Sequence, residues 1–108
     1  MNYMVLPGIA DPKEQKDAQI IDVICEHFKV TRQQLESSSR KQEIVYPRQV
    51  AYYLLMTICK TSCLKIGEYF FRNHTTVLYG KQTILNYLET DPVRRKEIDG
   101  LRQMLVGQ

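Results

Sequence analysis

Five consecutive polar residues in the middle of the chain carry side chains suited to recognising another molecule: Arg72, Asn73, His74, Thr75 and Thr76. They follow an apolar segment and precede a long run with helical periodicity. Asn73 is a favourable N-cap, so we expect a helix to begin at His74 and to present these side chains outward. Arginine, asparagine and histidine can hydrogen-bond to base edges, and threonine methyl groups can contact thymine. The cluster is therefore typical of a helix that reads duplex DNA.

The segment just before this cluster completes a helix-turn-helix pattern. Ser62 is a favourable N-cap, and Leu64, Ile66 and Phe70 supply the apolar positions of a short helix. Gly67, in the middle of that helix, costs about 1 kcal/mol relative to alanine. We therefore expect it to serve packing, by letting a second helix cross closely. In a helix-turn-helix, the N-terminal residues of the second helix contact the bases.

Hydrophobic periodicity along the rest of the chain predicts an all-α fold of about six helices around one core. The expected helices span about 17–28, 31–36, 47–60, 62–71 and 74–89, and a last one starts at Pro92. Pro47 is expected in the first turn of the central helix, where its missing N–H costs nothing. The residues expected to bury the faces of the last two helices are Val77, Leu78, Ile84, Leu85, Leu88, Val93, Ile98, Leu101 and Leu105.

Positive charge is concentrated in the middle of the chain, although the net charge is only +3. Residues 37–46 are expected to form a flexible, polar loop with Arg40 and Lys41 near its centre. The basic residues of the segment 32–72 are Arg32, Arg40, Lys41, Arg48, Lys60, Lys65 and Arg72, against Glu36, Glu43 and Glu68. Such a patch suits a phosphate backbone. A solvated charged surface is the alternative interpretation.

Two strings, SRKQEIVYPRQVAYYLL and LKIGEYFFRNHTTVLYG, resemble the C-terminal DNA-binding domain of the bacterial replication initiator DnaA. The resemblance covers about residues 17–105 and implies a TrpR-like helix-turn-helix fold. It also implies that Arg40 enters the minor groove, where negative potential is concentrated, and that Arg48 and Gln49 touch phosphate. The residues expected to contact DNA are Arg40, Lys41, Arg48, Gln49, Lys60, Ser62, Lys65, Arg72, Asn73, His74, Thr75 and Thr76.

The chain departs from the family pattern at three places. Asn73 stands where the family usually has aspartate, and Met56 stands where it has a basic residue that reaches a base. The turn from Phe70 to Arg72 is one residue shorter than the family's, which has two glycines there. Aspartate accepts from cytosine, whereas asparagine pairs best with adenine. Asn73 therefore either reads a base or serves only as a cap, and the family's usual DNA box is open as the target.

Sequence features also limit the other classes of function. There is no GxxxxGK[ST] motif, and Gly80–Thr83 lacks the leading glycine of a phosphate loop, so no ATPase is expected. A signal peptide and a membrane-spanning run are absent from the sequence, and three cysteines without disulfide spacing suit a cytoplasmic protein. We expect an irregular arm at 1–15 and a DNA-binding domain at 16–108. The initial methionine favours a standalone protein over a domain cut from a longer one.

The preferred function is sequence-specific binding of double-stranded DNA in the initiation or regulation of replication. A standalone transcriptional regulator, or a protein-interaction module that has lost DNA binding, are the alternatives. We expect no enzyme activity, no cofactor and no metal, because Cys59, Cys63 and His74 have poor zinc spacing. We expect a monomer, with other replication proteins as further partners.

Overall fold

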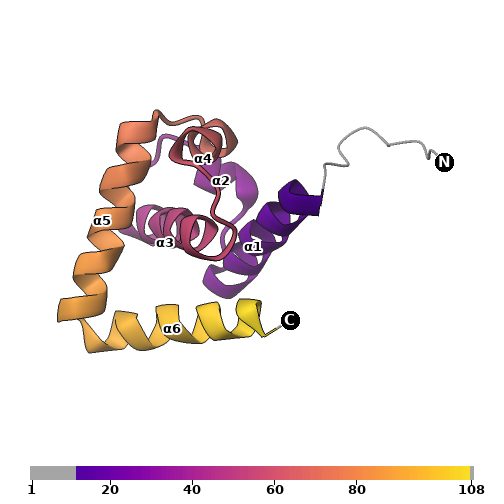
Figure 1. Ribbon diagram of the computed structural model, residues 1–108. Coiled ribbons are helices and arrows are strands. Elements are labelled where there is room, and N and C mark those ends of the chain that lie inside the picture. The colour runs from indigo at the N-terminus through magenta and orange to yellow at the C-terminus, as the bar shows by residue number, and fades with distance from the viewer. Residues whose placement is uncertain (1–11, 108) are drawn as a thin grey trace.

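The computed structural model describes residues 12–107, and six α-helices account for nearly all of them (Figure 1). The helices are α1 (Pro12–Phe28), α2 (Arg32–Glu36), α3 (Gln42–Ile58), α4 (Cys63–Phe70), α5 (His74–Thr90) and α6 (Pro92–Val106). The predicted all-α fold of about six helices is confirmed. Most of the expected N-terminal arm, residues 1–11, lies outside the described residues. Residues 12–15 were expected in that arm and instead form the first turn of α1.

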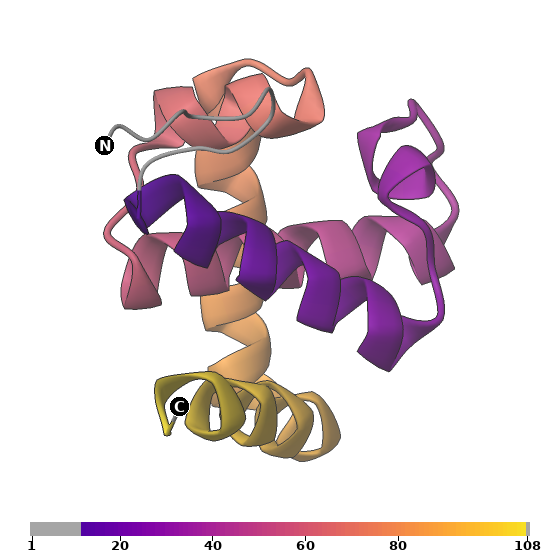
Figure 2. The same ribbon diagram turned by 90° about the vertical axis from the view of Figure 1, so that its right-hand side faces the viewer.

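The central helix is α3, and the other helices pack around it (Figures 1 and 2). Val50, Ala51, Leu54 and Leu55 are fully buried, as expected for the core helix. Helix α1 runs alongside α3, and α5 crosses it with α4 at one end and α6 at the other (Figure 2). This arrangement gives the molecule two distinct ends, one formed by α2, α4 and the start of α5, and the other formed by α6.

The start of α3 differs from the prediction. The helix begins at Gln42 rather than Pro47, so Pro47 lies inside it. A proline inside a helix removes one backbone hydrogen bond and costs about 3 kcal/mol. The early start buries Ile44 and Tyr46, and burying two side chains of this size stabilises by roughly 1.5–3 kcal/mol each. Packing of the first turn against the core therefore outweighs the cost of the proline.

Helices α4 and α5 form the predicted helix-turn-helix with the predicted caps. The Ser62 hydroxyl accepts from the Lys65 amide at 3.1 Å, and Asn73 Oδ1 accepts from the Thr76 amide at 3.0 Å. The packing role of Gly67 is confirmed, but its neighbour is the turn rather than a crossing helix. A Cβ at Gly67 would lie 2.3 Å from the carbonyl oxygen of Arg72. Only glycine lets the turn pass this close to α4.

Helix α6 closes the far end of the core. Asp91 caps it. Pro92 lies in its first turn, and Ile98, Leu101 and Leu105 are buried, as predicted. The expectations for two other apolar residues are wrong, because Val93 is 78% exposed and Leu78 of α5 is also largely exposed. Val93 is the first residue after the start of α6, and Leu78 is the fourth after the start of α5. In the first turn or so of a helix, the apolar periodicity does not fix which side chains face the core, so tertiary packing decides it.

Candidate nucleic-acid interface

The first turn of α5 presents the polar cluster to solvent. Asn73, His74, Thr75 and Thr76 are all exposed, on the side of α3 away from α6. Asn73 Oδ1 accepts both from the Thr76 amide, at 3.0 Å, and from the Thr76 hydroxyl, at 3.3 Å. The Nδ2 group of Asn73 has no acceptor among residues 12–107. The cap thus uses the acceptor oxygen of Asn73 and leaves the Nδ2 donor unused, so the same side chain can cap the helix and donate to a base.

A groove between α4 and the start of α5 adds residues that the sequence did not single out. Its lining includes Leu64, Glu68 and Phe71 together with Asn73 and His74. Leu64, one of the apolar positions expected in α4, is 65% exposed, and Phe71 is 73% exposed. Phe71 also has a left-handed backbone, with φ 56°, a conformation that favours glycine. The sequence held one signal of this left-handed conformation, because Phe71 stands in a turn where the family that the chain resembles has glycines.

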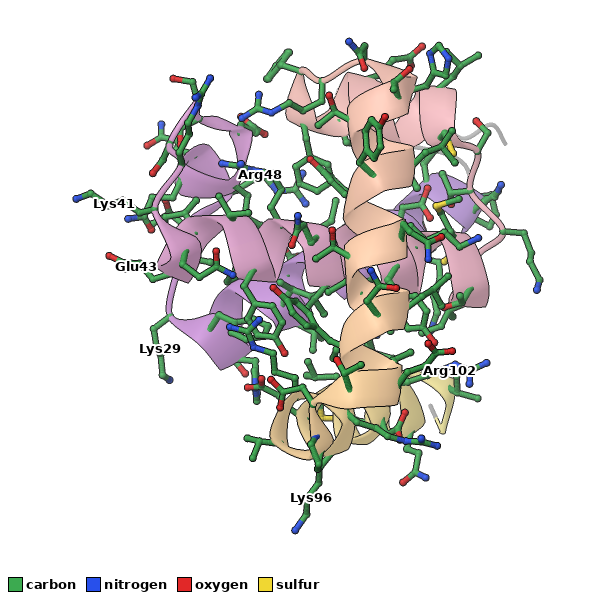
Figure 3. All side chains as sticks on the ribbon, turned by 90° about the vertical axis from the view of Figure 1, so that its left-hand side faces the viewer. Lys29, Lys41, Glu43, Arg48, Lys96 and Arg102 are labelled. Carbon is green, nitrogen blue, oxygen red and sulfur yellow. The ribbon has the colours of Figure 1, made fainter. Side chains whose placement is uncertain are left out.

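The serine-rich loop between α2 and α3 spans residues 37–41, which is shorter than the predicted 37–46, and local hydrogen bonds connect its residues. The Ser37 hydroxyl donates to the Gln34 carbonyl at 2.6 Å, the Ser39 amide donates to the Ser37 hydroxyl at 3.3 Å, and the Lys41 amide donates to the Ser39 hydroxyl at 3.2 Å. Serine side chains form such local bonds readily. Arg40 and Lys41 are exposed at the end of this chain of bonds, and Lys41 points away from the molecule in Figure 3.

Arg48 lies inside the molecule rather than on the surface. It extends from α3 toward the serine loop (Figure 3) and is only 6% exposed. Its Nε donates to the Leu35 carbonyl at 2.8 Å, its Nη2 to the Ser37 carbonyl at 2.9 Å and its Nη1 to the Ser39 carbonyl at 3.3 Å. Burial, followed by the nearby charge of Arg72, lowers the pKa of Arg48. This geometry does not match the expected phosphate contact, because the guanidinium is engaged with the chain itself.

Arg72 is half-buried in the helix-turn-helix turn and also bonds to the chain itself. Its Nη1 donates to the carbonyls of Phe70 and Phe71, both at 3.2 Å, and its Nη2 donates to the Ser37 carbonyl. Arg48 and Arg72 therefore share one acceptor, the Ser37 carbonyl. Across the part of the chain that the structure describes, neither forms an ion pair with a carboxylate. Gln49 is half-buried as well, and its buried Oε1 has no partner within that part.

The remaining expected residues lie at the N-terminus of α4. Lys60 is exposed and Ser62 caps the helix, so this end carries both a positive charge and the positive end of the helix dipole. The Lys65 ammonium lies 2.5 Å from a carboxylate oxygen of Glu14. That pairing reduces the charge that Lys65 can offer to a phosphate. Lys13, whose ammonium donates to the Lys60 carbonyl at 3.4 Å, adds a cation that the sequence did not indicate.

Residues 12–107 lack the features of two other classes of site. No group of three or more histidine, cysteine, aspartate and glutamate side chains in this range could hold a metal ion. No helix in the same range has the length and apolar character that a membrane span requires.

The family model and the similar proteins that match this chain all belong to the DnaA family. Residues 18–84 match the family described as bacterial dnaA protein helix-turn-helix. The chain is 39% identical over 97 residues to the chromosomal replication initiator protein DnaA of Thermus thermophilus and 36% identical over 98 residues to that of Symbiobacterium thermophilum. It is 42% identical over 81 residues to the DnaA protein of a Synechococcus species. These matches cover 89%, 90% and 74% of this chain, but only 20%, 21% and 17% of the relatives.

Proposed function

Because this chain belongs to the bacterial DnaA helix-turn-helix family, we propose that it binds double-stranded DNA sequence-specifically and catalyses no reaction. The observation that carries the proposal is the exposed first turn of α5 at the same end of the molecule as the basic loop 37–41, which Arg72 contacts from the turn before α5. A helix N-terminus with outward polar side chains fits the major groove. An exposed arginine next to it fits the minor groove. One duplex can therefore engage both features.

The proposed contacts divide into two kinds. His74, Thr75 and Thr76 contact base edges, and the Nδ2 of Asn73 donates to a base acceptor. Arg40 enters the minor groove. Phosphate contacts come from Lys41, Lys60, Ser62 and Lys65, and these position the protein without reading sequence. Three of the expected DNA contacts, Arg48, Gln49 and Arg72, are the least suited to touch DNA directly, because they are buried or half-buried.

We propose a role in the initiation of DNA replication or in its regulation, since the relatives are replication initiators. The chain spans about a fifth of their length, so this role and any association with other replication proteins belong to the proposal. A single helix-turn-helix with an adjacent basic loop is sufficient to engage one site, which favours binding as a monomer. We also propose a cytoplasmic location, because bacterial DNA lies in the cytoplasm. We propose that the DNA-binding domain starts at α1, with residue 12.

The proposal is tested by fluorescence anisotropy with the purified protein. A duplex that carries a DnaA-type box is compared with a scrambled duplex, at about 50 and about 200 mM salt, a range over which phosphate contacts weaken binding strongly. We expect a preference for the box of roughly a thousandfold, which is about 4 kcal/mol. We expect His74→Ala to lose about tenfold or more in affinity for the box. Lys96 is an exposed residue of α6, at the other end of the molecule (Figure 3), so Lys96→Ala is the control and should leave affinity unchanged.

The outcomes separate the alternatives. Equal, salt-dependent affinity for both duplexes keeps DNA as the partner and means that Asn73 and the shortened turn have changed the target site. No binding to either duplex at the lower salt concentration overturns the proposal. In that case the exposed Leu64 and Phe71 favour a protein-interaction module.

A further inference from the structure

Two arginines hold the loop 37–41 between α2 and α3, one from α3 and one from the helix-turn-helix turn. Arg48 reaches the loop from α3 and bonds to two of its carbonyls, those of Ser37 and Ser39, and to the carbonyl of Leu35 near the end of α2. Arg72 reaches the same loop from the turn and bonds to the Ser37 carbonyl. The Arg72 contact links segments that are 35 residues apart in the chain. It also links the two parts of the proposed interface, the minor-groove loop and the turn that precedes the recognition helix.

We propose that Arg48 and Arg72 are positioning residues that hold the loop 37–41, Arg48 against α3 and Arg72 against the helix-turn-helix turn, so that Arg40 and the first turn of α5 meet DNA as one preformed unit. This inference rests on the proposed function for its consequence in DNA binding. The clamp itself is a property of the free protein and is tested separately.

The chemistry of the two side chains favours a clamp over direct contact with DNA. A guanidinium has five N–H donors in a planar fork, which suits several carbonyls at once. Arg48 is almost fully buried, and its donors bond to carbonyls of the loop and of the end of α2. Arg72 donates to carbonyls of both segments, those of Phe70 and Phe71 at the helix-turn-helix turn and that of Ser37 in the loop. Lysine, with a single ammonium on a flexible stem, cannot reproduce this bridging.

The absence of acidic partners in the described residues supports the same assignment. Two neighbouring guanidiniums repel each other, and here carbonyl dipoles alone hold them. An ion pair would have neutralised the charge, whereas carbonyl bonding keeps both charges beside the proposed DNA surface. The nearby phosphate backbone would then strengthen the clamp rather than compete with it, because each added negative charge offsets the repulsion.

The clamp is tested first without DNA, by amide hydrogen exchange of the wild type, Arg72→Lys and Arg72→Ala. We expect the Ser39 and Lys41 amides, which bond to serine hydroxyls, to exchange at least about tenfold faster in both variants. Protection within α3 and α5 should stay at the wild-type level, which shows that the variants fold. Arg102→Ala, on exposed α6, is the control and changes neither. Unchanged exchange at Ser39 and Lys41 in folded Arg72 variants overturns the proposal.

The consequence for binding is tested by a double-mutant cycle. Arg40→Ala is measured in the wild type and in Arg72→Lys, a background that keeps the positive charge. We expect Arg40→Ala to lower affinity about tenfold in the wild type and less than about threefold in Arg72→Lys, because an unclamped loop no longer holds Arg40 at the groove. Equal losses in both backgrounds would mean that Arg40 and Arg72 act independently in binding, and this refutes the clamp as a positioning device. A wild type that binds no duplex refutes the proposed function, and hydrogen exchange then decides on the clamp alone.

Discussion

Gly67→Ala measures how closely the helix-turn-helix turn passes over α4. An alanine Cβ at this position would lie 2.3 Å from the Arg72 carbonyl oxygen, whereas ordinary contact begins at 3.4 Å. The obstacle is backbone, and it is fixed by the bond from the Arg72 amide to the Gly67 carbonyl, at 2.8 Å. The turn must therefore move by about 1 Å or α4 must distort, which costs about 1–3 kcal/mol for an overpacked site.

The net effect is smaller, because alanine is the better helix former by about 1 kcal/mol. Taking the upper part of the range for a backbone obstacle, we expect Gly67→Ala to lower the free energy of unfolding by about 1–2 kcal/mol. Gly100→Ala is the matched control. Gly100 lies in α6 and is exposed, and a Cβ at this position would meet no atom within 4 Å. This variant should gain roughly 0.5–1 kcal/mol from helix propensity alone.

The assay is equilibrium unfolding in urea, followed by far-ultraviolet circular dichroism. Gly67→Ala should lower the urea midpoint and Gly100→Ala should raise it, with similar slopes. Since the two substitutions share the same helix-propensity gain, their difference isolates the cost of the close approach. If Gly67→Ala raises the midpoint as much as Gly100→Ala does, the close packing of the turn on α4 is refuted.

Three further predictions concern single side chains. Asp17 is buried and its carboxylate accepts from the hydroxyls of Thr61, at 2.7 Å, and Tyr69, at 2.6 Å, so Asp17→Asn should cost about 1–3 kcal/mol in the same urea assay by replacing an acceptor with a donor. An unchanged midpoint would contradict this network. Burial, followed by a hydrogen bond to Asp17, raises the pKa of Cys59 to about 11, so its alkylation by iodoacetamide should rise about tenfold per pH unit between about pH 8 and 10 without levelling off. A plateau near pH 9 by peptide mass spectrometry would exclude the raised pKa. Asn73→Asp should keep the cap and the stability but lose the Nδ2 donor, and selection from random duplexes should then show a shift toward cytosine at one position. Identical selected sites would mean that residue 73 is only a cap.

The helix caps and the general fold could be predicted because their determinants are local. Thr31, Ser62, Asn73 and Asp91 each bond to an amide three residues ahead in the chain, so residue type and spacing suffice to identify them. Apolar periodicity likewise located the core of α1 and α3. The exposed first turn of α5 follows from its cap, and it is the part of the candidate interface that the sequence determined.

Contacts between distant segments decided the rest. Pro47 lies inside α3 because the preceding turn packs on the core, which no local rule for proline contains. Arg48 appeared as a surface cation in the sequence, yet carbonyls 9–13 residues away draw it inside. The sequence determined which side chains can recognise DNA. Only the tertiary structure decided which of them face outward and which hold the others in place, since buried hydrogen bonds between segments depend on the fold and not on spacing along the chain.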